Sequence, residues 1–391
     1  IDRVIKLLKN SHNIKSFYLR YDNSFTTLLK RLYYYVVFRM TSIWCNATRT
    51  KCKPFSTLLV DYSEFNYNGV DFSSIVADKL DITYVYYSNQ ENLMAAIKKF
   101  YSKEKPFLSI VYQSRGVTDS ISYFAKDNDC SALCISHGTV SPFYNRYDKL
   151  YKKYIAESVI LNNYPTVAIQ SPIANSFFST TKSHSTRLKT GNIIFASSSK
   201  IGKFIHRLKT KKTIVHAVTL KDISNIQFIG SHIYDEFINE IIDLQNVLGE
   251  EYNFIVQVHP QLRDIIQKHR DTFAGIKFNF GKISKILNKT DLLISFSSTV
   301  IEDALNCKIP VLLYDSVSRY KHCDCLDLDK DNFSPYPVYY TKHINNIDKY
   351  ASDIINHVDE IDWSTHVYPK ECNENFSKYV INSYNKQQVD I

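Results

Sequence analysis

Short hydrophobic runs of about four to eight residues recur along the chain, separated by longer stretches in which apolar positions have helical spacing. The short runs are rich in β-branched and aromatic residues, which predicts buried strands, and the stretches between them predict helices. Strands that alternate with helices are typical of βαβ units and a parallel sheet. In the first half the predicted strands are residues 56–62, 82–87, 107–113, 132–136 and 167–170.

The same alternation restarts after a polar and basic stretch, residues 180–212, which we interpret as an interdomain connection. Neither a repeat period nor eight evenly spaced βα units is visible, which argues against a solenoid, a propeller and a TIM barrel. The pattern therefore predicts an α/β protein with two Rossmann-like parallel sheets that face each other across a cleft. The predicted strands of the second half are residues 213–218, 252–259, 275–279, 291–296 and 309–315.

These patterns divide the chain into five parts. We expect an N-terminal helical segment at 1–50, a Rossmann-like acceptor domain at 51–179 and the connection at 180–212. A second Rossmann-like domain that binds a nucleotide sugar follows at 213–345, and a helical tail at 346–391 packs back on the first domain. The chain does not begin with Met, and we expect it to be part of a longer protein.

Residues 25–44, FTTLLKRLYYYVVFRMTSIW, form the most apolar long stretch. Lys30, Arg31 and Arg39 interrupt it, so it does not reach the roughly 20 apolar residues of a spanning helix. We expect a helix that packs on the first domain. The alternative is an amphipathic helix on a membrane surface.

Composition narrows the partners of the protein. The 391 residues are 44% hydrophobic and 22% charged, as in an ordinary globular protein with room for two cores. The 48 Lys and Arg outnumber the 39 Asp and Glu, and the net charge of +9 favours anionic partners such as nucleotides, phosphorylated substrates or an acidic membrane face. The basic residues do not gather into a recognition helix, which argues against nucleic-acid binding.

The eight cysteines follow no regular framework, so we expect them to be reduced in a cytoplasmic protein. His322-Cys323-Asp324-Cys325 is a cluster of potential metal ligands. A zinc site would need further ligands that the sequence does not place. We therefore expect a solvated loop there, and neither a metal ion nor another cofactor.

The first candidate site lies where the predicted strand 252–259 meets a helix. Pro260 suits the first helical position, because its missing N–H is not needed there. His259 thus stands beside a helix N-terminus, whose free N–H groups and positive dipole end attract anions. This corner predicts a phosphate site, with a histidine that binds no ligand as the alternative.

A similar corner follows the predicted strand 291–296. Ser297, Ser298 and Thr299 form the turn before the next helix, and their hydroxyl and backbone N–H groups predict an anion-binding nest. The alternatives are that the serines only cap the helix and that Thr299 and Glu302 form a capping box. Otherwise the Glu302 carboxylate binds ribose hydroxyls.

These motifs carry a resemblance to a known family. His259-Pro260, the Ser297–Thr299 turn and EDALNCKIPVLLY at 302–314 resemble GT-B glycosyltransferases of bacterial surface polysaccharides. The closest likeness is to capsule β-Kdo transferases and to bacterial sialyl- and polysialyltransferases that use CMP-sugars. The resemblance implies that His259, Pro260, Ser297, Ser298 and Thr299 hold the CMP phosphate and that Glu302 lies near the ribose.

The first domain supplies the catalytic candidates. ISHGTVSPFY at 135–144 is similar to the His-Gly segment of the capsule enzymes and of CDP-glycerol polymerases. His137 is a candidate general base, a ligand of the donor or acceptor, or a structural residue. Arg115 suits a sugar carboxylate, or is simply exposed, and Asp119 is a candidate acid or base.

The predicted function is transfer of Kdo or a sialic-acid-like sugar from a CMP-activated donor to a glycan or lipid-linked acceptor, in bacterial capsule or lipopolysaccharide synthesis. We expect a cytoplasmic enzyme, with peripheral contact to the anionic inner face of the plasma membrane. The nearest alternative is a CDP-glycerol-type polyol-phosphate transferase. The others are a sugar-nucleotide epimerase and a noncatalytic carbohydrate-binding module.

Overall fold

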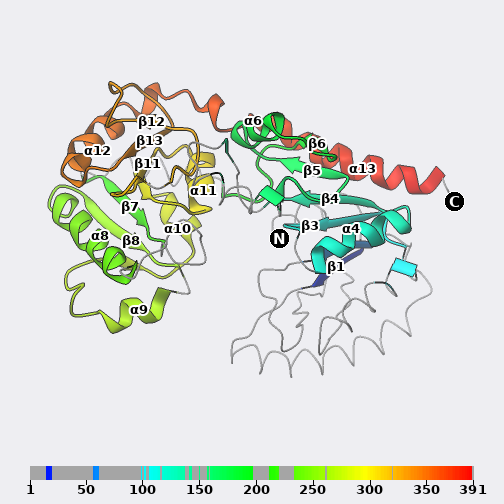
Figure 1. Ribbon diagram of the computed structural model, residues 1–391, viewed down its shortest axis with the longest axis horizontal. Helices are drawn as coiled ribbons and strands as arrows, with labels where there is room; N and C mark the ends of the chain where they lie inside the picture. The colour runs from blue at the N-terminus through cyan, green and yellow to red at the C-terminus, as the bar shows by residue number, and fades with distance from the viewer. Residues whose placement is uncertain are drawn as a thin grey trace.

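The computed structural model places two parallel sheets side by side (Figure 1). Only the backbone is described for residues 15–19, 56–60, 117, 233–234 and 387–389. The residues that the structure describes are 15–19, 56–60, 98, 101–102, 105–114, 117–136, 141–142, 149, 156–157, 159–196, 211–219, 233–259, 262–318 and 320–389.

The first sheet has its strands in sequential order, each parallel to the next. Parallel neighbours require crossover connections, and helix α4 (Val117–Asp127) makes one of them between β3 and β4. Helix α6 (Pro172–Thr180) connects β5 to β6. The strands are β1 (Lys15–Leu19), β2 (Ser56–Val60), β3 (Leu108–Val111), β4 (Ser131–Ile135), β5 (Thr166–Ile169) and β6 (Thr186–Lys189).

The second sheet has the order β12-β13-β11-β10-β7-β8-β9, and its pairs are also parallel. The chain adds strands on one side of β7 and then moves to the other side with β10. Such a reversal of strand order is a topological switch point, beside which ligands bind in open α/β sheets. The strands are β7 (Thr213–Ala217), β8 (Asn253–Gln257), β9 (Phe278–Asn279), β10 (Leu292–Ser295), β11 (Val311–Tyr314), β12 (Leu326–Asp327) and β13 (Val338–Thr341).

Both faces of the second sheet are buried, which explains why its strands are nearly continuous hydrophobic runs. Side chains of β10 alternate between the two faces: Leu292 and Ile294 join one hydrophobic cluster, and Leu293 joins the other. Helices α8 (Ile233–Leu248) and α12 (Ile347–Asn356) cover the first of these faces. Helices α10 (Ile283–Leu287) and α11 (Val300–Asn306) cover the second face. Helix α9 (Arg263–Lys268) follows β8.

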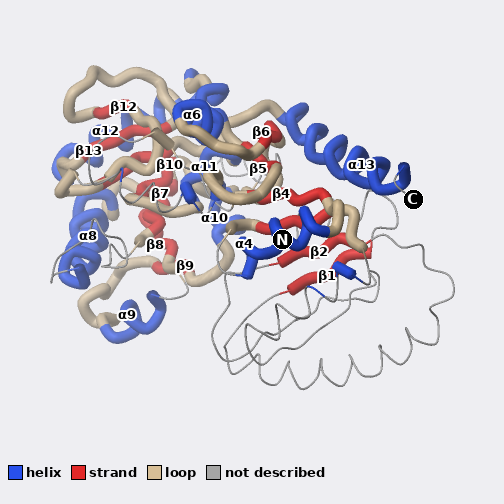
Figure 2. The backbone as a smooth tube through the Cα atoms, turned by 45° about the vertical axis from the view of Figure 1, so that its right-hand side comes forward, coloured by secondary structure: helices blue, strands red, loops and turns tan. Residues whose placement is uncertain are grey.

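The chain finally returns to the first sheet. Short 3-10 helices η2 (Ile344–Asn346), η3 (Val358–Glu360), η4 (Trp363–Thr365) and η5 (Lys370–Cys372) precede the last helix, α13 (Asn373–Val389). Phe376 and Val380 of α13 belong to the same buried cluster as the strands of the first sheet. Figures 1 and 2 show α13 running along that sheet. The C-terminal segment therefore links the two halves.

The structure confirms the predicted α/β class with two parallel sheets. The predicted strands 56–62, 107–113, 132–136 and 167–170 of the first half and all five of the second half are observed, most of them one to three residues shorter. The predicted strand 82–87 and the aromatic-rich segment 25–44 lie outside the described residues.

Three features differ from the predicted division of the chain. The predicted helical segment 1–50 contains β1, and the predicted connection 180–212 contains β6, because backbone pairing with β2 and β5 extends the first sheet at both edges. Helix α12 lies in the predicted tail 346–391 but packs against the second sheet, because its apolar face is buried there. Only the part that ends in α13 returns to the first sheet.

Membrane-spanning helices are not found in the described part of the chain, where no helix is both long enough and apolar enough.

Candidate functional site

The switch point of the second sheet lies between β7 and β10. Thr219, two residues after β7, donates a hydrogen bond from its hydroxyl to the carbonyl oxygen of Ser297, at 2.7 Å. Ser297 comes two residues after β10. The carboxyl ends of both strands are thus joined at this edge, where the sheet topology favours ligand binding.

His259 lies at the same edge, two residues after β8. Its side chain is exposed, and partial desolvation lowers its pKa from the ordinary value. Since β8 and β10 flank β7, their ends are separated by two strand spacings, roughly 10 Å. The structure therefore places His259 and the serine turn at one edge, on either side of β7.

A turn follows His259 before helix α9. The backbone N–H of Leu262 donates to the His259 carbonyl at 2.9 Å, which forms a tight turn, and α9 begins only at Arg263. Pro260, which the sequence places at the first helical position, lies outside the described residues.

The serine turn after β10 caps helix α11 through Ser298. The Ser298 hydroxyl accepts from the N–H of Val300 at 3.3 Å, and its carbonyl accepts from the N–H of Ile301 at 3.0 Å. Thr299 is the N-cap residue, is exposed, and makes no side-chain cap hydrogen bond. The predicted Thr299–Glu302 capping box is therefore absent.

Glu302 instead points into the protein. It is 4% exposed, and its Oε1 lies 3.1 Å from Nε2 of His322, which is also buried. The other ring nitrogen of His322, Nδ1, lies 3.2 Å from the hydroxyl oxygen of the half-buried Ser297. A continuous hydrogen-bonded series, Glu302–His322–Ser297, thus runs from the interior to the serine turn.

His322 also touches the first half of the molecule. Its carbonyl oxygen accepts a hydrogen bond from the hydroxyl of the buried Ser141 at 3.1 Å. Nearby, a carboxylate oxygen of Asp303 accepts from the backbone N–H of Ala196 at 2.6 Å. The loop and helix that carry the series are therefore fixed to residues that precede the second sheet.

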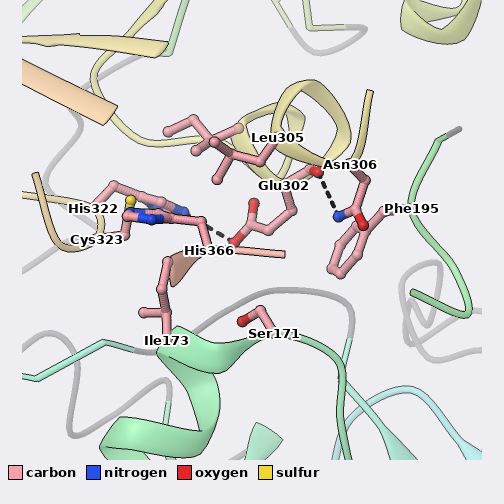
Figure 3. Close-up of a pocket in the computed structure, with 10 residues that line it drawn as sticks. Ser171, Ile173, Phe195, Glu302, Leu305, Asn306, His322, Cys323 and His366 are labelled. Carbon is pink, nitrogen blue, oxygen red and sulfur yellow. Dashed lines mark hydrogen bonds and ion pairs between the residues drawn. The ribbon is translucent and has the colours of Figure 1, made fainter. Parts of the chain in front are cut away.

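A pocket lies beside this contact (Figure 3). Ser171 and Ile173 line it from the first half, at the start of α6, opposite Glu302 and His322. The remaining lining residues are Phe195, Ile301, Leu305, Asn306, Cys323 and His366. The interior end of the series therefore borders a space between the two halves of the molecule.

His366 is a second buried histidine of this pocket. Its Nε2 lies 2.9 Å from the carbonyl oxygen of Asp324, and its Nδ1 lies 2.8 Å from the hydroxyl oxygen of Thr365. Burial lowers the pKa of His366, and the hydrogen bond with the Asp324 carbonyl acts in the opposite direction. The ring is thus held by the loop that precedes β12.

The expectation of a solvated loop at residues 322–325 is wrong for His322 and Cys323, whereas Asp324 is exposed. His322 is 7% exposed and Cys323 is 1% exposed, because this loop passes between the two halves of the molecule. Within the described ranges, no group of three or more His, Cys, Asp or Glu side chains could hold a metal ion.

The predicted catalytic residues of the first half are only partly described. Asp119, in the first turn of α4, accepts a hydrogen bond from the Ser114 hydroxyl at 2.5 Å and two from the Asn163 amide at 3.2 and 3.3 Å. This carboxylate is held among polar side chains of its own half. His137 and Arg115 lie outside the described residues.

His322 was missed as a functional candidate. The sequence places it 20 residues after Glu302, beyond a strand and a loop, so no spacing rule connects the two. The signal in the sequence is a histidine in the loop between two strands of the second sheet. From the sequence it is considered only as a potential metal ligand in a solvated loop, and its neighbours in the structure show a different environment.

Comparison with known protein families gives a match for part of the chain. Residues 195–385, just under half of the chain, match the family described as CDP-Glycerol:Poly(glycerophosphate) glycerophosphotransferase. This match indicates a transferase enzyme and covers His259, the serine turn, Glu302 and His322. Comparison with curated proteins gives no match.

Solved structures share the fold at low sequence identity. The wall teichoic acid polymerase TagF is 13% identical, with 99% of this chain and 98% of TagF covered and a TM-score of 0.52. A putative UDP-N-acetylglucosamine 2-epimerase from Listeria monocytogenes is 11% identical, with coverages of 96% and 97% and a TM-score of 0.52. The Neisseria meningitidis UDP-GlcNAc 2-epimerase bound to UDP-GlcNAc is 12% identical, with coverages of 95% and 100% and a TM-score of 0.50. The chain therefore has the GT-B-type fold.

These findings change the ranking of the predicted activities. The matched family favours the CDP-glycerol-type alternative over transfer of Kdo or sialic acid from a CMP-sugar. The predicted transferase class and GT-B architecture are retained.

Proposed function

We propose that this protein transfers a polyol phosphate, with glycerol phosphate favoured, from a CDP-activated donor to a hydroxyl group of a glycan or lipid-linked acceptor. The observation that carries the proposal is the match of residues 195–385 to the glycerophosphotransferase family. That range contains both predicted phosphate corners, which lie at the same edge of the second sheet. In this proposal the domain at 213–345 binds the donor and the domain at 51–179 binds the acceptor.

The edge of the second sheet offers suitable groups for a diphosphate. His259 is exposed there and has a lowered pKa, so near pH 7 its ring is a neutral hydrogen-bonding group. The exposed Thr299 and the half-buried Ser297 and Ser298 add hydroxyl groups across the switch point. A nucleoside diphosphate has the length to contact both corners.

The reaction is a phosphoryl transfer. The acceptor oxygen attacks the phosphorus that carries the glycerol, a new P–O bond forms, and the bond from this phosphorus to the bridging oxygen breaks. The electron pair of the broken bond leaves on CMP, and the acceptor proton passes to a general base, for which His137 is the candidate from the sequence. Hydrogen-bond donors at His259 and the serine turn would stabilise the charge that develops on CMP.

A CMP-sugar transferase would use the same corners with a monophosphate-linked donor. The family match favours the diphosphate donor, and the transferase match favours an enzyme over a noncatalytic carbohydrate-binding module. The two epimerase structures support the fold alone. A cytoplasmic location, with contact to the anionic face of the membrane, is part of the proposal and is supported by the net charge of +9.

The experiment that tests the proposal compares nucleotides and donors. Calorimetric titration with CDP, CMP, UDP and GDP should show preference for CDP. Incubation with CDP-glycerol labelled in the glycerol should then move label to a glycerol-phosphate acceptor and release CMP. Preference for CMP, with transfer only from a CMP-sugar, would restore the first prediction. No response to any cytidine nucleotide would contradict both activities.

A further inference from the structure

The hydrogen-bond direction in the Glu302–His322–Ser297 series depends on the protonation of Glu302 and His322. When Glu302 is ionised and His322 is neutral, Nε2–H donates to the carboxylate and the bare Nδ1 accepts the Ser297 hydroxyl proton. The hydroxyl oxygen of Ser297 then has only lone pairs directed toward a ligand. Lone pairs repel the oxygens of a phosphate, so this arrangement does not bind the donor through Ser297.

The hydroxyl can donate to a phosphate and keep its hydrogen bond with Nδ1 only if a proton is added to the series. If His322 carries protons on both nitrogens, Nδ1–H donates to the Ser297 oxygen, and the hydroxyl hydrogen is released toward a ligand. If the added proton sits on Glu302 instead, Nε2 accepts it and Nδ1–H again donates to Ser297. Both arrangements that let Ser297 donate to a phosphate and keep this hydrogen bond therefore contain one proton more than the arrangement with ionised Glu302 and neutral His322.

From this we infer that His322 is a positioning residue whose hydrogen bonds with Glu302 and Ser297 couple binding of the donor diphosphate to uptake of one proton. The inference rests on the proposed function, because it takes the serine turn as the phosphate site. It gives the buried Glu302 a role other than contact with ribose.

The surroundings of His322 restrict where the proton can go. Glu302 from α11 faces one ring nitrogen and Ser297 faces the other, and Tyr320 contacts the ring edge to face with ring centroids 6.3 Å apart. Cys323 and His366 are the other titratable side chains of the pocket. His366 is hydrogen-bonded to Asp324 and Thr365 instead. Among the described contacts, the titratable side chains connected to Ser297 are therefore those of His322 and Glu302.

Calorimetric titration with CDP in buffers of different ionisation enthalpy tests this coupling, because it counts the protons taken up per CDP bound. From about pH 5 to about pH 8, where histidines titrate, CDP affinity of the wild type should fall with rising pH, at most about tenfold per pH unit for one proton. His322→Asn keeps a polar group near Ser297 but cannot titrate. We expect it to remove up to about one proton of uptake and to flatten this dependence.

Two further variants give the test its controls. Ser297→Ala leaves His322 in place but removes the hydroxyl, and it should also lose the uptake that depends on His322. His366→Asn changes a buried histidine of the same pocket, and His259→Asn changes a histidine at the other corner; neither should remove that uptake. Circular dichroism checks folding, and Ser297→Ala keeps the test available if His322→Asn does not fold.

The outcomes separate the inference from the proposed function. Binding of CDP with equal proton uptake in the wild type, His322→Asn and Ser297→Ala would overturn the inference alone. Uptake that survives in Ser297→Ala but not in His322→Asn would also overturn it, since the hydroxyl would then play no part. If CDP does not bind the wild type, the proposed function fails and the inference fails with it.

Discussion

The two corners of the second sheet lie at the same edge, but their polar side chains differ in burial. His259 stands exposed after β8, and a short turn separates it from α9. The corner after β10 instead continues into the interior through His322 to the buried Glu302. An exposed side chain can bind a ligand while contributing little to packing. A group tied to a buried pair serves both binding and stability, so the two corners should respond differently to mutation.

Glu302→Ala should show the largest effect. Removing one partner of a buried pair leaves the other without its hydrogen bond, so we expect the free energy of unfolding to fall by about 2–3 kcal/mol. Chemical denaturation measures this loss. Glu302→Gln, which keeps an oxygen acceptor for His322, should lose about half as much. Equal stability of both variants and the wild type would show that the Glu302–His322 hydrogen bond does not stabilise this corner.

His259→Ala should weaken binding with little loss of stability. A hydrogen bond to a charged phosphate contributes about 1.5–3 kcal/mol, so CDP affinity should fall by roughly 10- to 150-fold. Because the side chain is exposed, the free energy of unfolding should change by less than about 0.5 kcal/mol. Titration with CDP and denaturation of the same preparation measure both quantities. Parallel losses of stability and affinity would show that His259 is a packing residue.

Ser141→Ala tests the link between the second corner and the first half. It leaves the His322 carbonyl without a described donor, and the expected loss of stability is about 1 kcal/mol. Ser141 follows His137 by four residues, so we expect kcat to decrease. Because Ser141 also fixes the loop of His322, CDP affinity should decrease as well. Ser114→Ala, at a hydroxyl that binds Asp119 within the first half, is the matched control for a lost hydroxyl. Unchanged stability and unchanged CDP affinity in Ser141→Ala would contradict this link.

Acidification should distinguish the buried His366 of the pocket from the exposed His259, and we expect this effect to be the smallest. Burial lowers the pKa of His366 below that of the unfolded chain, so the unfolded state binds more protons as pH falls through about 6.5. Stability is therefore lost as pH falls through this value, until the pH also passes the folded pKa. Denaturation at several pH values should show a smaller acid loss in His366→Asn than in the wild type. The exposed His259, replaced by Asn, should change this dependence less.

Elements that depend on local interactions were predicted from the sequence, and elements that depend on contacts between distant segments were not. Strands of the second sheet were predictable because burial of both faces leaves a continuous apolar run, as in Leu292–Ser295. Strand β6 was missed because its residues, Thr186–Lys189, are mostly exposed, and its pairing with β5 is decided by backbone hydrogen bonds. The local side-chain pattern does not predict such a pairing between backbones.

The sequence by itself determined the α/β class, the strand that leads to His259 and the serine turn that follows β10. These features depend on local hydrophobic patterns and on turn residues a few positions apart. Only the tertiary structure decided that Glu302 faces His322 instead of capping its own helix, and that Ser141 holds the loop of His322. The physical reason is that hydrogen bonds between buried groups depend on which segments the fold brings together, and a linear spacing of 20 or 181 residues carries no information about that contact.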